Sequence, residues 1–242
     1  MTKVYMHMVI KNEASRYLES CLKWNSTHFD GVHVYDDRST DTSVEIATQH
    51  AKVDVRDEND PSFLESESKF RSNGLKSFFG MMLPEMGSWI ISLDADEFFH
   101  AKSIRNKLDN VPKSFDRVSF PVREIWSYTN SRLSQRMDGY WGSIKQTRAI
   151  RITEDLDVSD FSSKKMGCGS VPQLGLPSVY MDDAEIFHFG YACHDDRVAK
   201  YERYSSMSHG HSNSHINSIL DKSRCAQVDT TLGNFVWRGY RG

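Results

Sequence analysis

The stretch that most constrains the fold of this sequence runs from Ser88 to Phe99, where an apolar segment ends in acidic residues. Residues 89–93 form a Trp-Ile-Ile-x-Leu run of strand length, which is typical of a strand buried on both faces, as in a parallel sheet. Asp94, Asp96 and Glu97 follow directly. In open α/β sheets, ligands bind in the crevice outside the carboxyl ends of the strands. The stretch therefore predicts a central strand whose end carries an acidic site.

Carboxylates at the end of a buried strand need a counter-charge. Unpaired buried charges are costly, so such groups are paired with Arg or Lys, are protonated, or bind a metal ion. An all-oxygen cluster favours a hard cation such as Mg²⁺ or Mn²⁺. The alternative interpretation is a strand that ends in an acidic loop with no ligand.

The composition is that of an ordinary soluble globular protein. The chain has 242 residues, which is long enough for one large α/β domain. With 26% charged residues and a net charge of −3, it is not basic enough to indicate a nucleic-acid partner. No apolar run approaches the roughly 20 residues that span a bilayer, and the first residues do not resemble a signal peptide. We therefore expect a cytoplasmic protein with no membrane partner. Its four cysteines contain no CxxC pair and are expected to be free thiols.

The first hundred residues alternate between strand and helix patterns. We expect strands over residues 3–10, 31–35 and 52–55, and a helix carrying residues 14–22 with Asn12 as its cap. A second helix should carry residues 44–47, and a third, over 69–79, should lead into the central strand. Such alternation predicts a parallel, doubly wound sheet.

The rest of the chain is less regular. We expect strands at residues 118–122, 146–153 and 184–191, a helix carrying residues 198–204, and long loops over 127–142 and 162–177. We predict one domain over residues 1–205, followed by a C-terminal extension over 206–242.

A second carboxylate pair, Asp36 and Asp37, ends the predicted strand at 31–35. Carboxylates can accept hydrogen bonds from a base and a ribose without a metal, whereas a diphosphate cannot approach carboxylates without one. The segments Lys11-Asn12-Glu13-Ala14, Tyr35 to Thr42 and Asp94 to Phe98 closely resemble the family 2 glycosyltransferases of the GT-A fold. The resemblance covers about the first hundred residues and recurs at Ile186 to Tyr191.

The resemblance implies a fold and an activity. The fold would be α/β, a GT-A (Rossmann-like) doubly wound, mostly parallel sheet, with a nucleotide-binding half over about 1–100 and an acceptor-side half over about 101–205. Residues 206–242 would form a helical or irregular tail. The activity would be metal-dependent transfer of a sugar from a nucleotide-diphosphate donor, a UDP-sugar, to a hydroxyl acceptor.

The same resemblance assigns roles to residues. Asp94-Ala95-Asp96 matches the DxD motif, which implies Mg²⁺ or Mn²⁺ on the donor diphosphate, with Asp94 and Asp96 as ligands and Asp96 as the more direct one. His188 matches a further metal ligand, the alternative being a packed core histidine. Asp36 and Asp37 would hold the base and ribose. The backbone near Lys11 would edge the base pocket, and Arg71 would lie near the diphosphate unless it belongs to a solvated helix face.

An inverting enzyme also needs a carboxylate base for the acceptor hydroxyl. Thr153-Glu154-Asp155 looks like the motif that supplies this base in many family members, which nominates Asp155; the alternative is a simple acidic loop. Four other carboxylates are rivals: Glu97, Glu124, Asp182 and Asp183. A retaining mechanism would not use such a base.

Two other functions compete with glycosyl transfer. A nucleotidyltransferase would want a glycine-rich phosphate loop after the first strand, and Lys11-Asn12-Glu13 has no glycine. A catalytically silent module that binds a sugar nucleotide or glycan is the other. The donor sugar, the stereochemistry and the acceptor, whether glycan, protein or modified nucleic-acid base, stay open, since a fold does not settle them.

Overall fold

The computed structural model describes residues 2–129, 132–158, 171–172, 178–206, 213–221 and 225–228. The strands are β1 (Val4–Ile10), β2 (Gly31–Asp36), β3 (Lys52–Val55), β4 (Trp89–Ser92), β5 (Glu97–Ala101), β6 (Arg117–Thr129), β7 (Arg132–Arg136), β8 (Lys145–Arg151), β9 (Ser178–Tyr180), β10 (Ala184–His188) and β11 (Cys225–Val228). The helices are α1 (Leu18–Asn25), α2 (Ser43–Thr48), α3 (Glu67–Met82), α4 (Ile104–Asp109), α5 (His194–Ser206) and α6 (Asn213–Ser218), with a 3₁₀ turn, η1, at Gly139–Gly142.

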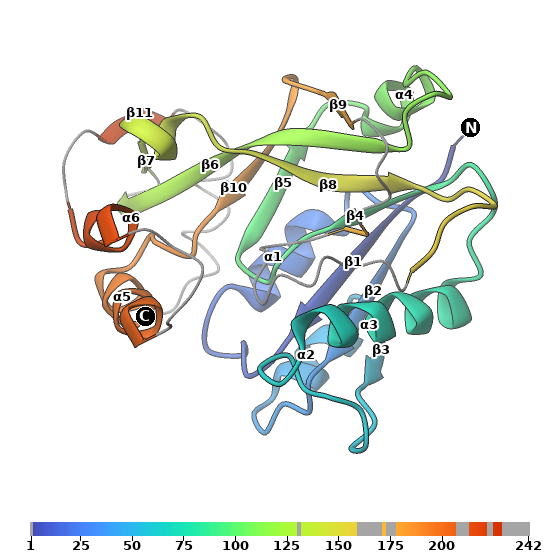
Figure 1. Cartoon of the computed structure of the whole chain (residues 1–242), viewed down its shortest axis with the longest axis horizontal. Helices are drawn as coiled ribbons and strands as arrows, with labels where there is room; N and C mark the ends of the chain where they lie inside the picture. Colours follow the sequence, from blue (N-terminus) through green and yellow to red (C-terminus); the bar gives the residue numbers. More distant parts are fainter. Residues whose placement is uncertain are drawn as a thin grey trace.

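The central sheet is parallel over the strands of the first hundred residues. Its strand order is β11-β7-β6-β8-β4-β1-β2-β3. The four strands β3, β2, β1 and β4 pair in parallel, whereas β8 runs antiparallel to both β4 and β6. Consequently the carboxyl ends of β1, β2 and β4 meet at one edge of the sheet. This arrangement confirms the predicted α/β, Rossmann-like GT-A fold (Figure 1).

Two apolar cores lie on opposite faces of the sheet because side chains along a strand alternate in direction. On one face, Met6 and Met8 of β1 belong to the large core that includes Leu18 and Leu22 of α1. On the other face, Tyr5 and Ile90 pack with Leu75 and Phe78 of α3. Helices therefore cover both faces, which is the doubly wound arrangement that the alternating pattern predicts.

The helix after β1 begins later than expected. α1 starts at Leu18, and Asn12 adopts a left-handed backbone conformation with φ of 54°, so Asn12 is not the helix cap. Instead, its side-chain oxygen accepts a hydrogen bond from the backbone of Thr40 at 2.7 Å. The polar residues after β1 and β2 thus bind each other and hold the two loops together at the sheet edge, a use that helical spacing does not indicate.

The part of the chain after residue 100 contains more strand than predicted. The acidic stretch continues into β5, which pairs with β10, and the expected loop over 127–142 holds the end of β6, all of β7 and η1. The prediction of a loop there is wrong because these strands form through pairing with distant segments rather than through a local pattern. β10 also pairs with β6, which sets His188 opposite Glu124.

The described parts of the C-terminal extension pack on this half. β11 pairs with β7, the indole N–H of Trp126 donates to the Asp221 carbonyl at 3.1 Å, and Arg136 donates to the Ser218 carbonyl. Figure 1 shows α5 and α6 side by side at the end of the molecule opposite β3. The division at residue 205 stays a prediction, and the loop expected at 162–177 lies outside the described residues except for 171–172.

Two minor expectations concern the cysteines and the membrane. Cys21, Cys193 and Cys225 are free thiols, and Cys168 lies outside the described residues. Within the described part of the chain, every helix is too short or too polar to cross a bilayer.

Candidate functional site

The turn after β4 is fixed from within by Glu97. The Glu97 carboxylate accepts a hydrogen bond from the Asp94 amide at 2.9 Å, and the Glu97 amide donates to the Asp94 carbonyl at 3.0 Å. Arg148 of β8 forms an ion pair with the same carboxylate, and both side chains are buried. Burial raises the pKa of Glu97 to about 7, although Arg148 opposes this shift. Glu97 therefore points into the protein, whereas Asp94 and Asp96 lie at the sheet edge.

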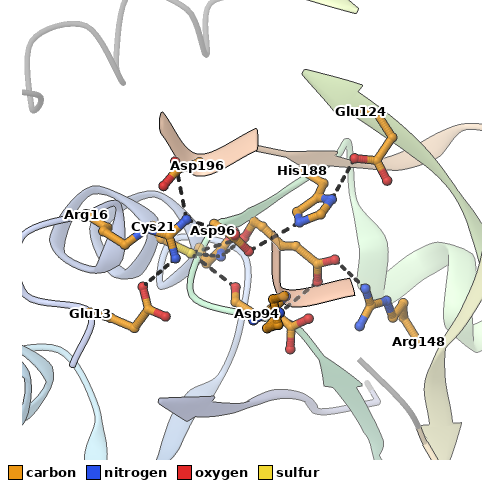
Figure 2. Close-up of polar contacts among 12 residues, drawn as sticks. Glu13, Arg16, Cys21, Asp94, Asp96, Glu124, Arg148, His188 and Asp196 are labelled. Atoms are coloured by element: carbon orange, nitrogen blue, oxygen red, sulfur yellow. Dashed lines mark hydrogen bonds and ion pairs between the residues drawn. The ribbon is translucent and has the colours of Figure 1, made fainter. Parts of the chain in front are cut away.

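A chain of three side chains crosses the edge from β4 to β6. The Nε2 atom of His188 lies 3.6 Å from Oδ1 of Asp96, and its Nδ1 atom lies 2.7 Å from Oε2 of Glu124 (Figure 2). The side chains of His188 and Asp96 are 12% and 11% exposed. The imidazole is thus held between two carboxylates.

The charges of this chain depend on one another. Burial acts to lower the pKa of His188, but Glu124 and Asp96 outweigh it and hold that pKa well above its usual value. Burial acts to raise the pKa of Asp96, and His188, Lys200 and Arg16 together lower it. Without a metal, His188 is therefore a cation between two anions.

Arg16 forms a second set of contacts around Asp96. Its guanidinium lies 3.8 Å from the Asp96 carboxylate, 3.4 Å from Asp196 of α5 and 3.2 Å from Glu13 (Figure 2). Burial raises the pKa of Glu13 to about 7, against the effect of Arg16. The loop after β1 therefore contributes both a cation and an easily protonated carboxyl group to the site.

Arg71 lies beside Asp94. Its side chain is 6% exposed, its Nε atom lies 2.8 Å from Glu67, and NH2 lies 3.7 Å from Oδ1 of Asp94. The guanidinium also stacks over the ring of Phe63 at 5.4 Å. The alternative of a solvated helix face is therefore wrong, and Asp94, at 27% exposure, faces a held cation.

Asp36 and Asp37 are both engaged in holding loops. Asp36 is fully buried and accepts hydrogen bonds from the amide and hydroxyl of Ser39 at 2.8 and 2.5 Å. Asp37 contacts Arg56 at 2.5 Å and Lys11 at 3.2 Å, and it accepts a hydrogen bond from the Phe63 amide. Both lie at the predicted strand end. Lys11, at 44% exposure, is the solvent-facing partner of Asp37.

Asp155 lies at the opposite edge of the sheet from this cluster. The Ile152 amide donates to the carbonyl of Ser88, which precedes β4, whereas Asp94 follows the other end of that strand. Asp155 is exposed three residues further on. A base must reach the reacting hydroxyl, so this position does not suit the predicted role.

Of the four rival bases, two lie away from the cluster and two lie at it. Asp182 and Asp183 precede β10 and lie at its other end from His188, and Asp183 pairs with Lys107. Glu97 and Glu124 lie at the site, and each is bound by a cationic partner.

The residues at the sheet edge would suit a divalent cation whose remaining ligands come from a substrate. Among the described residues, no group of three His, Cys, Asp or Glu side chains has the geometry of a metal site. Asp96 and His188 offer one oxygen and one nitrogen 3.6 Å apart, and Asp94 is turned towards Arg71. Mg²⁺ and similar ions are commonly held by one or two protein ligands plus substrate phosphates. The hydrogen bond from Nδ1 of His188 to Glu124 is the outer contact that ligating histidines usually make.

Several members of the cluster were not predicted as site residues. Glu13 and Arg16 follow β1, and Asp196 and Lys200 come from α5. The position of Glu13 after a parallel strand was an available signal. The residues of α5 had none, since only the pairing of β10 with β5 and β6 brings that helix to the site.

Comparison with known proteins gives similar structures but no sequence relatives. No protein-family model and no curated protein matches the chain. Glucosyl-3-phosphoglycerate synthase from Mycobacterium tuberculosis, with phosphoglyceric acid, matches at 17% identity and a TM-score of 0.37, over 50% of this chain and 44% of that one. The same enzyme with Mn²⁺ and UDP-glucose matches at 16% and 0.37, over 50% and 44%. 4-Diphosphocytidyl-2C-methyl-D-erythritol synthase matches at 12% and 0.45, over 76% and 89%. The chain thus spans under half the length of the first enzyme.

Proposed function

We propose that this protein is a glycosyltransferase that uses a divalent cation and a nucleotide-diphosphate sugar, a UDP-sugar, as the donor. The observation that carries the proposal is the Asp96–His188–Glu124 chain at the carboxyl edge of the parallel strands. A carboxylate and a held imidazole at a ligand-binding sheet edge suit Mn²⁺ or Mg²⁺ on a diphosphate. The sequence resemblance to family 2 enzymes points to the same chemistry.

Each residue of the chain has a distinct part in holding the donor. Asp96 supplies a carboxylate oxygen, and Nε2 of His188 supplies a lone pair once it has lost its proton. Glu124 accepts a hydrogen bond from the Nδ1–H group of His188 and so fixes the ring and its tautomer. A bound divalent cation would stabilise the charge that develops on the leaving diphosphate. Arg71, held by Glu67, orients Asp94 and adds a positive charge beside it.

The nucleoside would lie over the loops that follow β1 and β2. Asp37 is the carboxylate for the base and ribose, because its partner Lys11 is exposed and can turn away when a nucleoside arrives. Asp36 supports that contact by fixing the loop through Ser39. The acceptor would approach from the side of β6 and α5.

A panel of nucleotide sugars, each with Mn²⁺ or with EDTA, tests the proposal. Wild type should release UDP from a UDP-sugar when the metal is present and not when it is absent. It should release no GDP from GDP-sugars in either case. Asp96→Asn should be inactive, whereas Asp155→Asn, the matched change at the opposite edge, should behave like wild type. Pyrophosphate release from a nucleoside triphosphate and a sugar phosphate would indicate a nucleotidyltransferase instead. Binding of a sugar nucleotide without any cleavage would indicate a silent module.

A further inference from the structure

Three polar side chains converge above Gly190. A side chain at this position would place its Cβ atom closer than 3.0 Å to Nζ of Lys200, Nε2 of His188 and Oδ2 of Asp96. Glycine is the residue that permits such an approach because it has no Cβ atom. The ammonium of Lys200 therefore lies immediately beside the His188 imidazole and the Asp96 carboxylate, the two groups to which the proposed function assigns the divalent cation.

Helix α5 brings Lys200 to this place. The ammonium lies over the ring of Tyr191 at 4.2 Å from its centre, and Lys200 is half-buried. One turn earlier on the same helix, Asp196 contacts Arg16 at 3.4 Å. The helix is thus attached to the site at two points, an anion that pairs with Arg16 and a cation that faces Asp96.

We propose that Lys200 is one of the cations of this site, together with Arg16, and competes with a divalent metal ion for the space beside Asp96 and His188. The inference rests on the proposed function. A divalent ion within bonding distance of both Asp96 and His188 would lie within a few ångströms of the ammonium. Like charges at that separation repel strongly in a partly buried site. Metal binding therefore requires Lys200 to swing away, which its flexible side chain on a surface helix permits.

Competition predicts that removal of the ammonium strengthens metal binding. Lys200→Met keeps an unbranched side chain of similar length and removes the ammonium that lies over Tyr191. Its Kd for Mn²⁺ should fall by roughly tenfold or more, given the size of charge interactions at a few ångströms in such an environment. Lys200→Arg keeps the charge and should bind Mn²⁺ like wild type. A purely structural lysine would leave the metal affinity of both variants unchanged.

The test is a titration of the full chain with Mn²⁺ alone, with the unbound ion measured by electron paramagnetic resonance. Lys102→Met is the control, because it removes one lysine charge from an exposed position beyond the far end of β5. We expect tighter binding by Lys200→Met, wild-type binding by Lys200→Arg and Lys102→Met, and no specific binding by Asp96→Asn. Equal or weaker binding by Lys200→Met, or an equal gain in Lys102→Met, overturns the inference. Metal-dependent donor cleavage by wild type would uphold the proposed function even then.

Discussion

The imidazole of His188 is held from both sides, with Nδ1 at 2.7 Å from Glu124 and Nε2 at 3.6 Å from Asp96. Glu124→Ala removes the outer contact and should weaken Mn²⁺ binding by about 10- to 100-fold, because outer partners fix the orientation of a ligating histidine. Glu124→Gln, whose amide oxygen can still accept a hydrogen bond from the Nδ1–H group, should lose less. Calorimetric titration with Mn²⁺ measures both. Glu154→Ala, at an exposed carboxylate, is the control, and equal affinities throughout would remove Glu124 from the site.

The buried ion pair between Glu97 and Arg148 should matter for stability and for the turn that carries Asp94. Arg148→Met leaves the carboxylate without its cation, and breaking such a pair costs roughly 3–5 kcal/mol of unfolding free energy. The loss should be smaller at pH 5 than at pH 8, since Glu97 can then take up a proton. Urea denaturation of this variant and of the double variant with Glu97→Gln checks the idea. A double variant no more stable than the single one would contradict it.

Two buried histidines should make stability pH-dependent. Nδ1 of His7 lies 3.0 Å from Nδ1 of His33, whose Nε2 contacts Ser77. Burial lowers the pKa of His33 from 6.5 to about 4 and that of His7 in the same direction. Between about pH 6.5 and 4 the unfolded chain binds protons that the folded protein does not, so stability falls as the pH falls through this window.

The share of His33 in this loss is up to about 3 kcal/mol. His33→Gln should flatten the dependence of urea unfolding on pH between 6.5 and 4, whereas His194→Gln, at an exposed position, should not. An unchanged slope in His33→Gln would show that the pair is not the cause.

The position of Asp155 predicts that its loss has little effect. Because Ile152 pairs with Ser88 at the opposite edge from Asp94, Asp155→Asn should keep kcat within about twofold of wild type, whereas loss of a true base typically lowers it by about 10²-fold or more. Steady-state turnover of the donor identified by the panel provides the measurement. A loss of that size with unchanged donor affinity would return Asp155 to the active site.

The pattern of the sequence was sufficient for the part of the fold that local periodicity encodes. β1, β2, β3 and β4 lie within a residue or two of the predicted strands, because each is a short apolar run bounded by polar turns. β5 and β7 were missed, since their stability comes from pairing with β10 and with β6 and β11. Strand preference depends strongly on such partners, which one sequence does not reveal.

The residues of the candidate site also differ in how far the local sequence pattern predicts their position. The placement of Asp94, Asp96 and Asp37 at one edge of the sheet could be predicted, because parallel strands bring their carboxyl ends together. Arg16 and Lys200 could not, because side chains reach the site from a loop and a distant helix. Asp155 was nominated from the sequence but lies at the other edge, since a short acidic motif does not indicate at which edge of the sheet it will lie.

Calorimetry of UDP binding tests the central claim most directly, because it measures the metal and the nucleotide in one site. UDP should bind wild type at least tenfold more tightly with Mn²⁺ than with EDTA, a difference of about 1.4 kcal/mol or more. Asp96→Asn should bind UDP with the same weak affinity in both buffers, while Asp155→Asn keeps the full effect of the metal. Equal UDP affinity of wild type in Mn²⁺ and in EDTA, or an intact metal effect in Asp96→Asn, would contradict a divalent cation held at Asp96 and His188.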